Sequence, residues 1–145
     1  MTAVQTPADR LPAAAALSSI GSKLQKNLFF LVLVMLGNIV AALMLIGGAY
    51  GMATQDHFTG ATLYFGYLAD GIPAAFFVAA AVLTVVVSIR TWSMLTAANG
   101  GDLTALKRLS SPGLAVVAIF ACWVAPGITL LKVNKAVGEL TTEPR

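Results

Sequence analysis

Three long runs of apolar residues constrain this chain more than any other feature. The first run, residues 28–50, has 23 residues and contains no charge. About 20 apolar residues are enough for an α-helix to cross a bilayer. Two further runs follow at residues 71–94 and 113–131, and Arg90 is the only charged residue within them. The sequence therefore predicts an all-α membrane protein with three transmembrane helices.

The composition excludes an ordinary water-soluble domain. Hydrophobic residues make up 58% of the chain and charged residues only 10%, whereas a typical soluble domain has about 25% charged residues. The nine Lys and Arg residues flank the apolar runs instead of forming one basic face. Such flanking is typical of residues that set membrane topology. We therefore expect the lipid bilayer, and not nucleic acid, to be the first partner of the chain.

The segments outside the apolar runs are shorter and more polar. Residues 1–26 are predicted to form a polar tail, over 1–12, and then a helix in which Leu17, Ile20 and Leu24 recur at helical spacing. That helix either lies on the membrane surface or projects into water as the start of the first span. Residues 27–140 form the transmembrane domain, with an amphipathic extension after residue 131. Residues 141–145 are expected to form a frayed tail.

The connection between the first two runs has a distinct character. Residues 51–70 contain no Lys or Arg but several aromatic residues, which favour the headgroup level of a membrane. Pro73 is expected in the first turn of the second span, where a missing N–H has no cost. Arg90 and Trp92 are expected to anchor the far end of that span at the opposite interface.

The distribution of positive charge predicts the orientation. Cytoplasmic segments of membrane proteins carry an excess of Lys and Arg. With a cytoplasmic N-terminus and three crossings, six Lys and Arg residues lie inside and three outside, which predicts a periplasmic or extracellular C-terminus in a bacterial cytoplasmic membrane. Lys132 and Lys135 fall on the disfavoured side unless the third helix bends at Pro126 and does not cross completely.

Residues that would carry chemistry are scarce. The single histidine, His57, lies in the connecting segment, and the single cysteine, Cys122, lies in an apolar run. Haem ligation and metal binding need clusters of such residues, and ion pathways usually contain ionisable residues within the spans. We expect no catalytic, cofactor or metal site, and no enzyme activity.

Four small residues and four anchor residues are the candidate functional positions. Small residues let neighbouring helices approach closely in a membrane. The helix-packing candidates are Gly37, Ala41, Ala75 and Ala79. The hinge and interface candidates are Trp123, Pro126, Arg90 and Trp92.

The C-terminal third contains a recognisable pattern. It has Ser111-Pro112-Gly113, then Trp123 with Pro126, then Glu139-Leu140. This pattern resembles the end of the DUF4328 family of bacterial integral membrane proteins of unknown function. Thr129 and Val133 stand where that family tends to have Asn and Pro. The resemblance implies a membrane fold and no catalytic role.

Two functions follow as expectations. The first is a non-catalytic accessory or structural subunit of a larger bacterial membrane complex, respiratory or photosynthetic, because the small residues favour contact with other subunits or with a second copy. The alternative is a self-assembling channel or small-solute transporter, with a pore lined by Asn38, Thr84 and Ser88.

Overall fold

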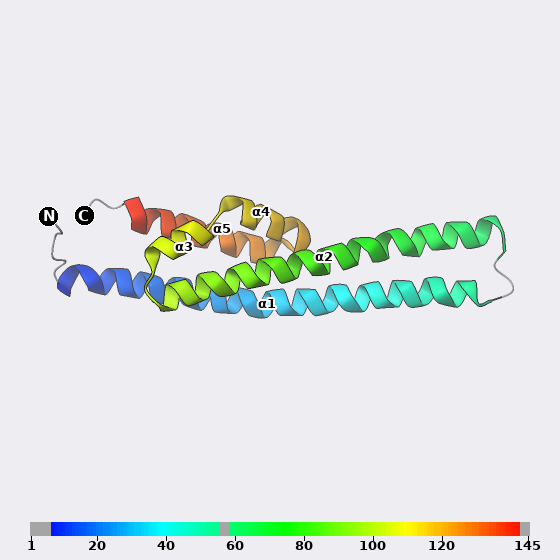
Figure 1. Ribbon diagram of the computed structural model, residues 1–145, viewed down its shortest axis with the longest axis horizontal. Coiled ribbons are helices and arrows are strands. Elements are labelled where there is room, and N and C mark those ends of the chain that lie inside the picture. Colours follow the sequence, from blue (N-terminus) through cyan, green and yellow to red (C-terminus); the bar gives the residue numbers. More distant parts are fainter. Residues whose placement is uncertain (1–6, 56–58, 143–145) are drawn as a thin grey trace.

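The computed structural model describes residues 7–55 and 59–142, which form five α-helices joined by short connections (Figure 1). The prediction of an all-α fold is confirmed over these residues. The helices are α1 (Pro7–Ala53), α2 (Ala61–Asn99), α3 (Leu103–Leu109), α4 (Pro112–Ala121) and α5 (Val124–Thr142).

Helices α1 and α2 form a long antiparallel hairpin that runs the length of the molecule (Figure 1). Their register is set by close approaches at glycines. Gly21 lies beside Asn99, Gly48 beside Asp70, and Gly66 beside Met52. Buried positions on α1 recur three, four or seven residues apart, which is the spacing that keeps one face of a helix against a partner helix. These buried positions include Ile20, Leu24, Asn27, Leu31, Asn38 and Ala42.

Both long helices extend further than the sequence predicts. Helix α1 is continuous from Pro7, so residues 7–12 are helical instead of a tail, and the segment 13–26 is the start of the same helix as the first apolar run. Helix α2 begins at Ala61, directly after Gly60, which has a positive φ of 59° that glycine tolerates best. Pro73 therefore lies inside α2, not in its first turn.

The third apolar run is two helices instead of one. Helix α4 ends at Ala121, and the chain reverses at Cys122 and Trp123, where Trp123 has a φ of 70°. Helix α5 then runs back beside α4 (Figure 1). The hydroxyl of Ser110, just before α4, donates to Asn134 Oδ1 in the middle of α5 at 2.7 Å. The prediction of one helix over 113–131 is therefore wrong.

Pro126 explains why the chain starts a new helix here. It is the third residue of α5, and the first four N–H groups of a helix have no intrahelical partner. A proline there costs no hydrogen bond, whereas in the middle of a helix it would remove one. The predicted hinge therefore lies three residues earlier, at Trp123. The open end of the α4–α5 hairpin lies away from the reversal. There Ser111 caps α4 by accepting a hydrogen bond from the Leu114 N–H at 3.2 Å.

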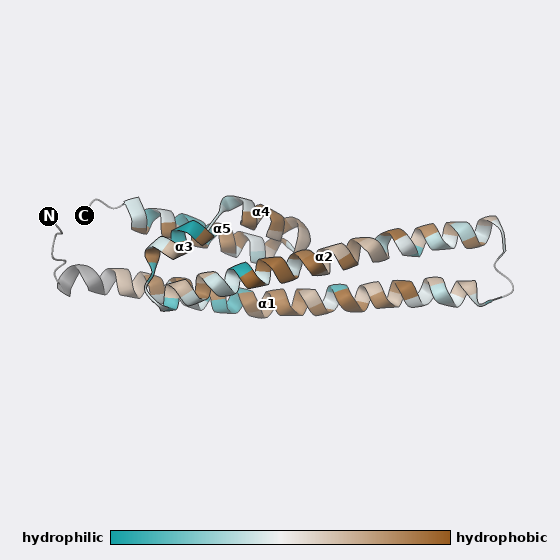
Figure 2. Cartoon of the chain, in the orientation of Figure 1, coloured by the Kyte–Doolittle hydropathy of each residue, from teal (hydrophilic) through white to brown (hydrophobic). Residues whose placement is uncertain are grey.

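The buried core occupies only one half of the molecule. Side chains from all five helices meet near the start of α1, including Leu24, Met94, Leu106, Ala118 and Val133. The other half is the α1–α2 hairpin alone. Figure 2 shows apolar residues covering the middle of this hairpin, while polar residues gather on α3 and α5. The two halves therefore differ in thickness.

A substitution at Gly127 tests the packing of α4 against α5. A Cβ at this position would overlap the Ile119 side chain and lie 2.8 Å from the Ala115 carbonyl oxygen. We expect Gly127→Ala to destabilise the fold by about 1–3 kcal/mol through overpacking, as measured by thermal unfolding in mild detergent. Gly138 is the matched control, since a Cβ there meets nothing within 4 Å. Equal stability of the two Gly→Ala variants would contradict the antiparallel packing.

Candidate functional site

Two charged residues of α2 bracket its apolar stretch. Asp70 and Arg90 are twenty residues apart, with no charge between them. At 1.5 Å per residue they are separated by about 30 Å, which is the thickness of the hydrocarbon core of a bilayer. Both α1 and α2 contain stretches long and apolar enough to cross a membrane. Helices α3 and α4 are long and apolar enough for a third span only if the two are taken together across their 52° bend.

Aromatic side chains mark both ends of this apolar stretch. Trp92 is exposed two residues beyond Arg90. At the other end, near Asp70, Tyr50, Tyr64 and Tyr67 are exposed. Aromatic residues with one polar atom prefer the membrane–water interface, where the ring is half in lipid and the polar atom is hydrated. The anchor residues Arg90 and Trp92 therefore lie together at one boundary of the apolar stretch.

The seam between α1 and α2 contains buried polar side chains. The Thr84 hydroxyl donates to the Ala80 carbonyl oxygen at 2.7 Å, and the Thr91 hydroxyl donates to the Val87 carbonyl oxygen at 2.8 Å. Two amides differ from these hydroxyls. Asn27 is 2% exposed and Asn38 is 5% exposed, and the Nδ2 atom of each has no hydrogen-bond partner.

Asn38 lies near the centre of the apolar stretch. Because Gly48 is opposite Asp70, the antiparallel register places Asn38 opposite about Ala80, halfway between Asp70 and Arg90. An unpaired amide is costly in such surroundings because no water reaches it. Asn38 and Thr84 face the seam, and Ser88 donates to the Thr84 carbonyl oxygen at 2.7 Å. Of the three residues expected to line a pore, Asn38 and Thr84 are therefore buried and Ser88 is half-buried.

The tip of the α4–α5 hairpin is tied to this seam. The thiol of Cys122 donates to the Thr84 hydroxyl oxygen at 3.3 Å, and both side chains are fully buried. Beside this contact, the aromatic side chains of the tip point outward: Phe120 is 81% exposed and Trp123 is 72% exposed. The tip therefore combines one polar attachment to α2 with an uncovered apolar surface.

None of the predicted helix-packing residues is fully buried in the seam. Gly37, Ala75 and Ala79 are exposed, and Ala41 is half-buried. A Cβ on Gly37 would meet nothing within 4 Å. Within the apolar stretch, the small residues that lie buried along the seam are Ala42, Ala74 and Ala80. Each is next to a predicted position, and only the register of the two helices distinguishes the inward residues from the outward ones.

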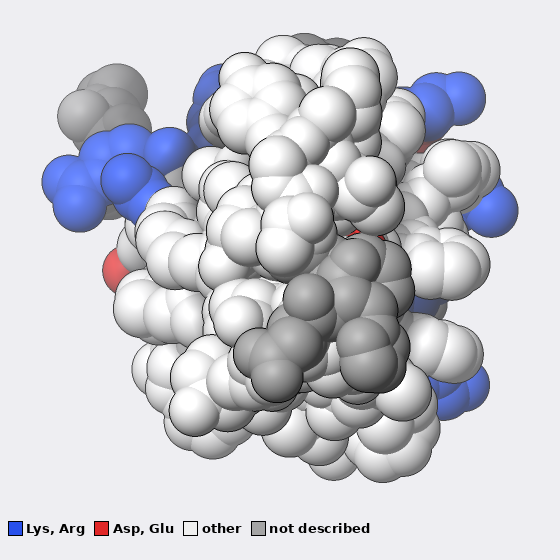
Figure 3. Space-filling view, turned by 90° about the vertical axis from the view of Figure 1, so that its right-hand side faces the viewer, with Lys and Arg blue, Asp and Glu red and all other residues white. Residues whose placement is uncertain are grey.

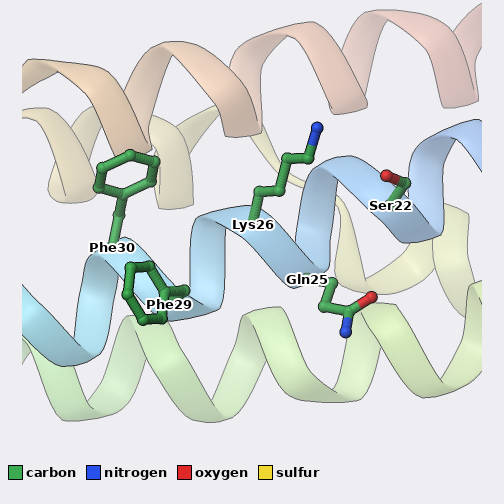
Figure 4. Close-up of a pocket in the computed structure, with 5 residues that line it drawn as sticks. All are labelled: Ser22, Gln25, Lys26, Phe29 and Phe30. Carbon is green, nitrogen blue, oxygen red and sulfur yellow. The ribbon is translucent and has the colours of Figure 1, made fainter.

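A shallow depression lies on α1 where its polar part meets its apolar part. Its volume is about 390 Å³, and it is lined by Ser22, Gln25, Lys26, Phe29 and Phe30. In Figure 4 the Lys26 side chain points toward α5, while Gln25 and Phe29 point toward α2. Lys26 is the last charged residue before the first apolar run. The depression therefore brings one cation, two polar side chains and two aromatic rings to the boundary of the apolar stretch.

Positive charge collects at the end of the molecule that holds α3 and α5. The seven Lys and Arg side chains that the structure describes all lie in this half, on the first part of α1, the last part of α2, α3 and α5. Figure 3 shows the opposite end, where Lys and Arg atoms are visible only around the margin. The seven described Lys and Arg side chains are those of Lys23, Lys26, Arg90, Lys107, Arg108, Lys132 and Lys135.

Comparison of the chain with protein-family models, curated proteins and solved structures finds no match. The resemblance of the C-terminal third to the DUF4328 family stays a prediction. Its residues fall at defined places in the fold, with Ser111 at the start of α4, Trp123 at the reversal and Pro126 in the first turn of α5. His57 lies outside the described residues.

The unpaired amide of Asn38 provides a test of the seam. We expect Asn38→Leu, which has a similar shape, to keep the fold and to raise its unfolding free energy by about 1–3 kcal/mol, because a buried donor without an acceptor is removed. Chemical unfolding in mild detergent followed by circular dichroism measures the change. Val40→Leu, at an exposed position nearby, is the control and should have little effect. A clear loss of stability in Asn38→Leu would show that the amide has a partner.

Proposed function

We propose that the protein is a non-catalytic structural or accessory subunit of a larger complex in the bacterial cytoplasmic membrane. The observation that supports this proposal is a second set of small residues on the outer surface of the hairpin. Gly71, Ala75 and Ala79 are spaced four residues apart and are all exposed. They lie on the side of α2 that faces away from Thr84 and the seam, because a helix turns 100° per residue.

Helix α2 does not use these three outward small residues, the outward stripe, to pack against α1. Between helices in lipid there is little hydrophobic driving force, so close backbone approach at small residues is a main source of association. The α1–α2 seam already has its own small residues, Ala42, Ala74 and Ala80. The outward stripe therefore offers a second helix, from another subunit or another copy, a surface for close approach.

We also propose that both ends of the described chain lie on the cytoplasmic side. The reversal at Trp123 brings Lys132 and Lys135 to the end that already carries the other Lys and Arg residues. With only α1 and α2 crossing, the described cations all lie on one side, in agreement with the positive-inside rule. This arrangement removes the conflict that a third crossing creates for the two lysines of α5.

The stripe is tested by the double variant Ala75→Leu/Ala79→Leu. In native membranes solubilised with mild detergent, we expect the tagged wild-type protein to elute as a larger assembly and the variant to elute mainly alone, because the added side chains separate the backbones. Leu83→Phe is the control, since it enlarges another exposed side chain of α2 and should leave the assembly intact. A wild-type protein that elutes only as a monomer would refute the proposal.

The topology is tested by reporters fused after residue 145. We expect a fluorescent reporter that matures only in the cytoplasm to be active, and an alkaline phosphatase reporter that needs the periplasm to be inactive. The same reporters placed between Gln55 and Thr59 serve as the internal control and should give the opposite pattern. Phosphatase activity at the C-terminus would mean that the chain crosses a third time.

A further inference from the structure

The arms of the α4–α5 hairpin are too short to cross a bilayer. Helix α4 has 10 residues, so it extends about 15 Å, half of the hydrocarbon thickness. Helix α5 is apolar only from Val124 to Leu131, before Lys132, which gives about 12 Å. An apolar hairpin with arms of this length fits within a single leaflet.

The contact between Cys122 and Thr84 sets the depth of the hairpin tip. Thr84 is six residues from Arg90 along α2, so the tip lies about 9 Å below the level of Arg90. The midplane of the bilayer is about 15 Å below that level. The Ser110–Asn134 hydrogen bond closes the other end of the hairpin, close to where the lysines of α5 begin. The hairpin therefore enters the leaflet beside Arg90 and stops short of the midplane.

The surface of the tip fits acyl chains. Phe120, Trp123 and Val124 are more than half exposed, and at this depth the groups around them are lipid tails. Trp123 also keeps a left-handed backbone conformation that is unfavourable for a bulky side chain. The tight reversal brings the exposed rings to the deepest point of the hairpin. Lipid tails surround the rings there, so the free-energy cost of exposing them to water is avoided.

The hairpin makes the molecule wider in one leaflet than in the other. In the leaflet beside Arg90, α4 and the first part of α5 lie next to α1 and α2 (Figure 1). In the opposite leaflet α1 and α2 are alone, and their side chains there are mostly exposed. Each helix with its side chains is about 10 Å across, so the two leaflets contain clearly different cross-sections of protein.

We propose that the α4–α5 hairpin is a wedge inserted into a single leaflet, and that it makes the protein prefer membranes that are convex on the side carrying Lys and Arg. The partner of the exposed tip is the acyl region of that leaflet. Convex curvature spreads the outer leaflet and so accommodates the wider half of the molecule. This inference rests on the membrane placement of α1 and α2, but it does not require the outward stripe or any other subunit.

The experiment uses purified full-length protein added to preformed vesicles of one lipid composition and two sizes. The cation-rich end should stay outside, because moving Lys and Arg across the bilayer is costly, and protease removal of a C-terminal tag checks this orientation. After flotation, we expect the protein density per lipid to be several-fold higher on small sonicated vesicles than on large extruded ones. Equal density on both sizes would overturn the proposal.

Variants at the tip test whether the α4–α5 hairpin causes the preference for small vesicles. Phe120→Lys places a charge on the exposed tip, and we expect it to abolish the preference for small vesicles while binding and helix content remain. Phe120→Ser is a milder second variant and should reduce the preference. Thr104→Lys adds the same charge at an exposed position of α3 and should behave as the wild type. A preference that survives both Phe120 variants would contradict the wedge.

Tryptophan fluorescence measures the depth independently. The chain has two tryptophans, so Trp92→Phe leaves Trp123 as the only reporter. Lipids brominated at defined positions along the acyl chain quench a nearby indole. Because the tip lies about 9 Å below the level of Arg90 in a leaflet about 15 Å thick, we expect the strongest quenching from bromines near the middle of the acyl chain. Strongest quenching from the terminal positions, or no quenching, would overturn the assignment. Because purified protein is used, the result is separate from any failure to find a partner complex.

Discussion

The apolar length of α2 between Asp70 and Arg90 is the constraint on which the remaining structure depends. A bilayer admits charged side chains only at its boundaries without a large cost, so these two residues fix how the α1–α2 hairpin sits in a membrane. Other features can be placed along this apolar stretch. Asn38 lies near its centre, Thr84 lies in the half beside Arg90, and the exposed tyrosines lie at the Asp70 end.

The same constraint explains why α4 and α5 form a hairpin. A single arm of 10 residues is too short to span the apolar layer, whereas the reversal lets α5 run back beside α4. Gly127 permits this close packing, since there is no room for a Cβ against Ile119 and Ala115. The return places Lys132 and Lys135 with the other cations. Packing and charge therefore favour the same arrangement.

The seam of the long hairpin balances polar and apolar groups. The hydroxyls of Thr84 and Thr91 donate hydrogen bonds to carbonyl oxygens of their own helix, so they can be buried in the seam at little cost. The amides of Asn27 and Asn38 have unpaired donors and cost more. Buried polar residues at such seam positions fix the register of paired helices in some coiled coils, and here they occur along α1, opposite the small and hydroxyl-bearing residues of α2.

The sequence by itself determined that the protein is helical and that its first two apolar runs are long enough to cross a membrane, because length and charge distribution are local properties of the chain. The tertiary structure alone decided which small residues face inward, since Ala74 and Ala75 differ only in the register of α2 against α1. The tertiary structure also decided that the third apolar run forms two helices instead of one. Residues 113–131 have the composition of a span, and the reversal at Trp123 depends on the packing of Gly127 against α4 and of Cys122 against Thr84, contacts that no periodicity in the sequence reveals.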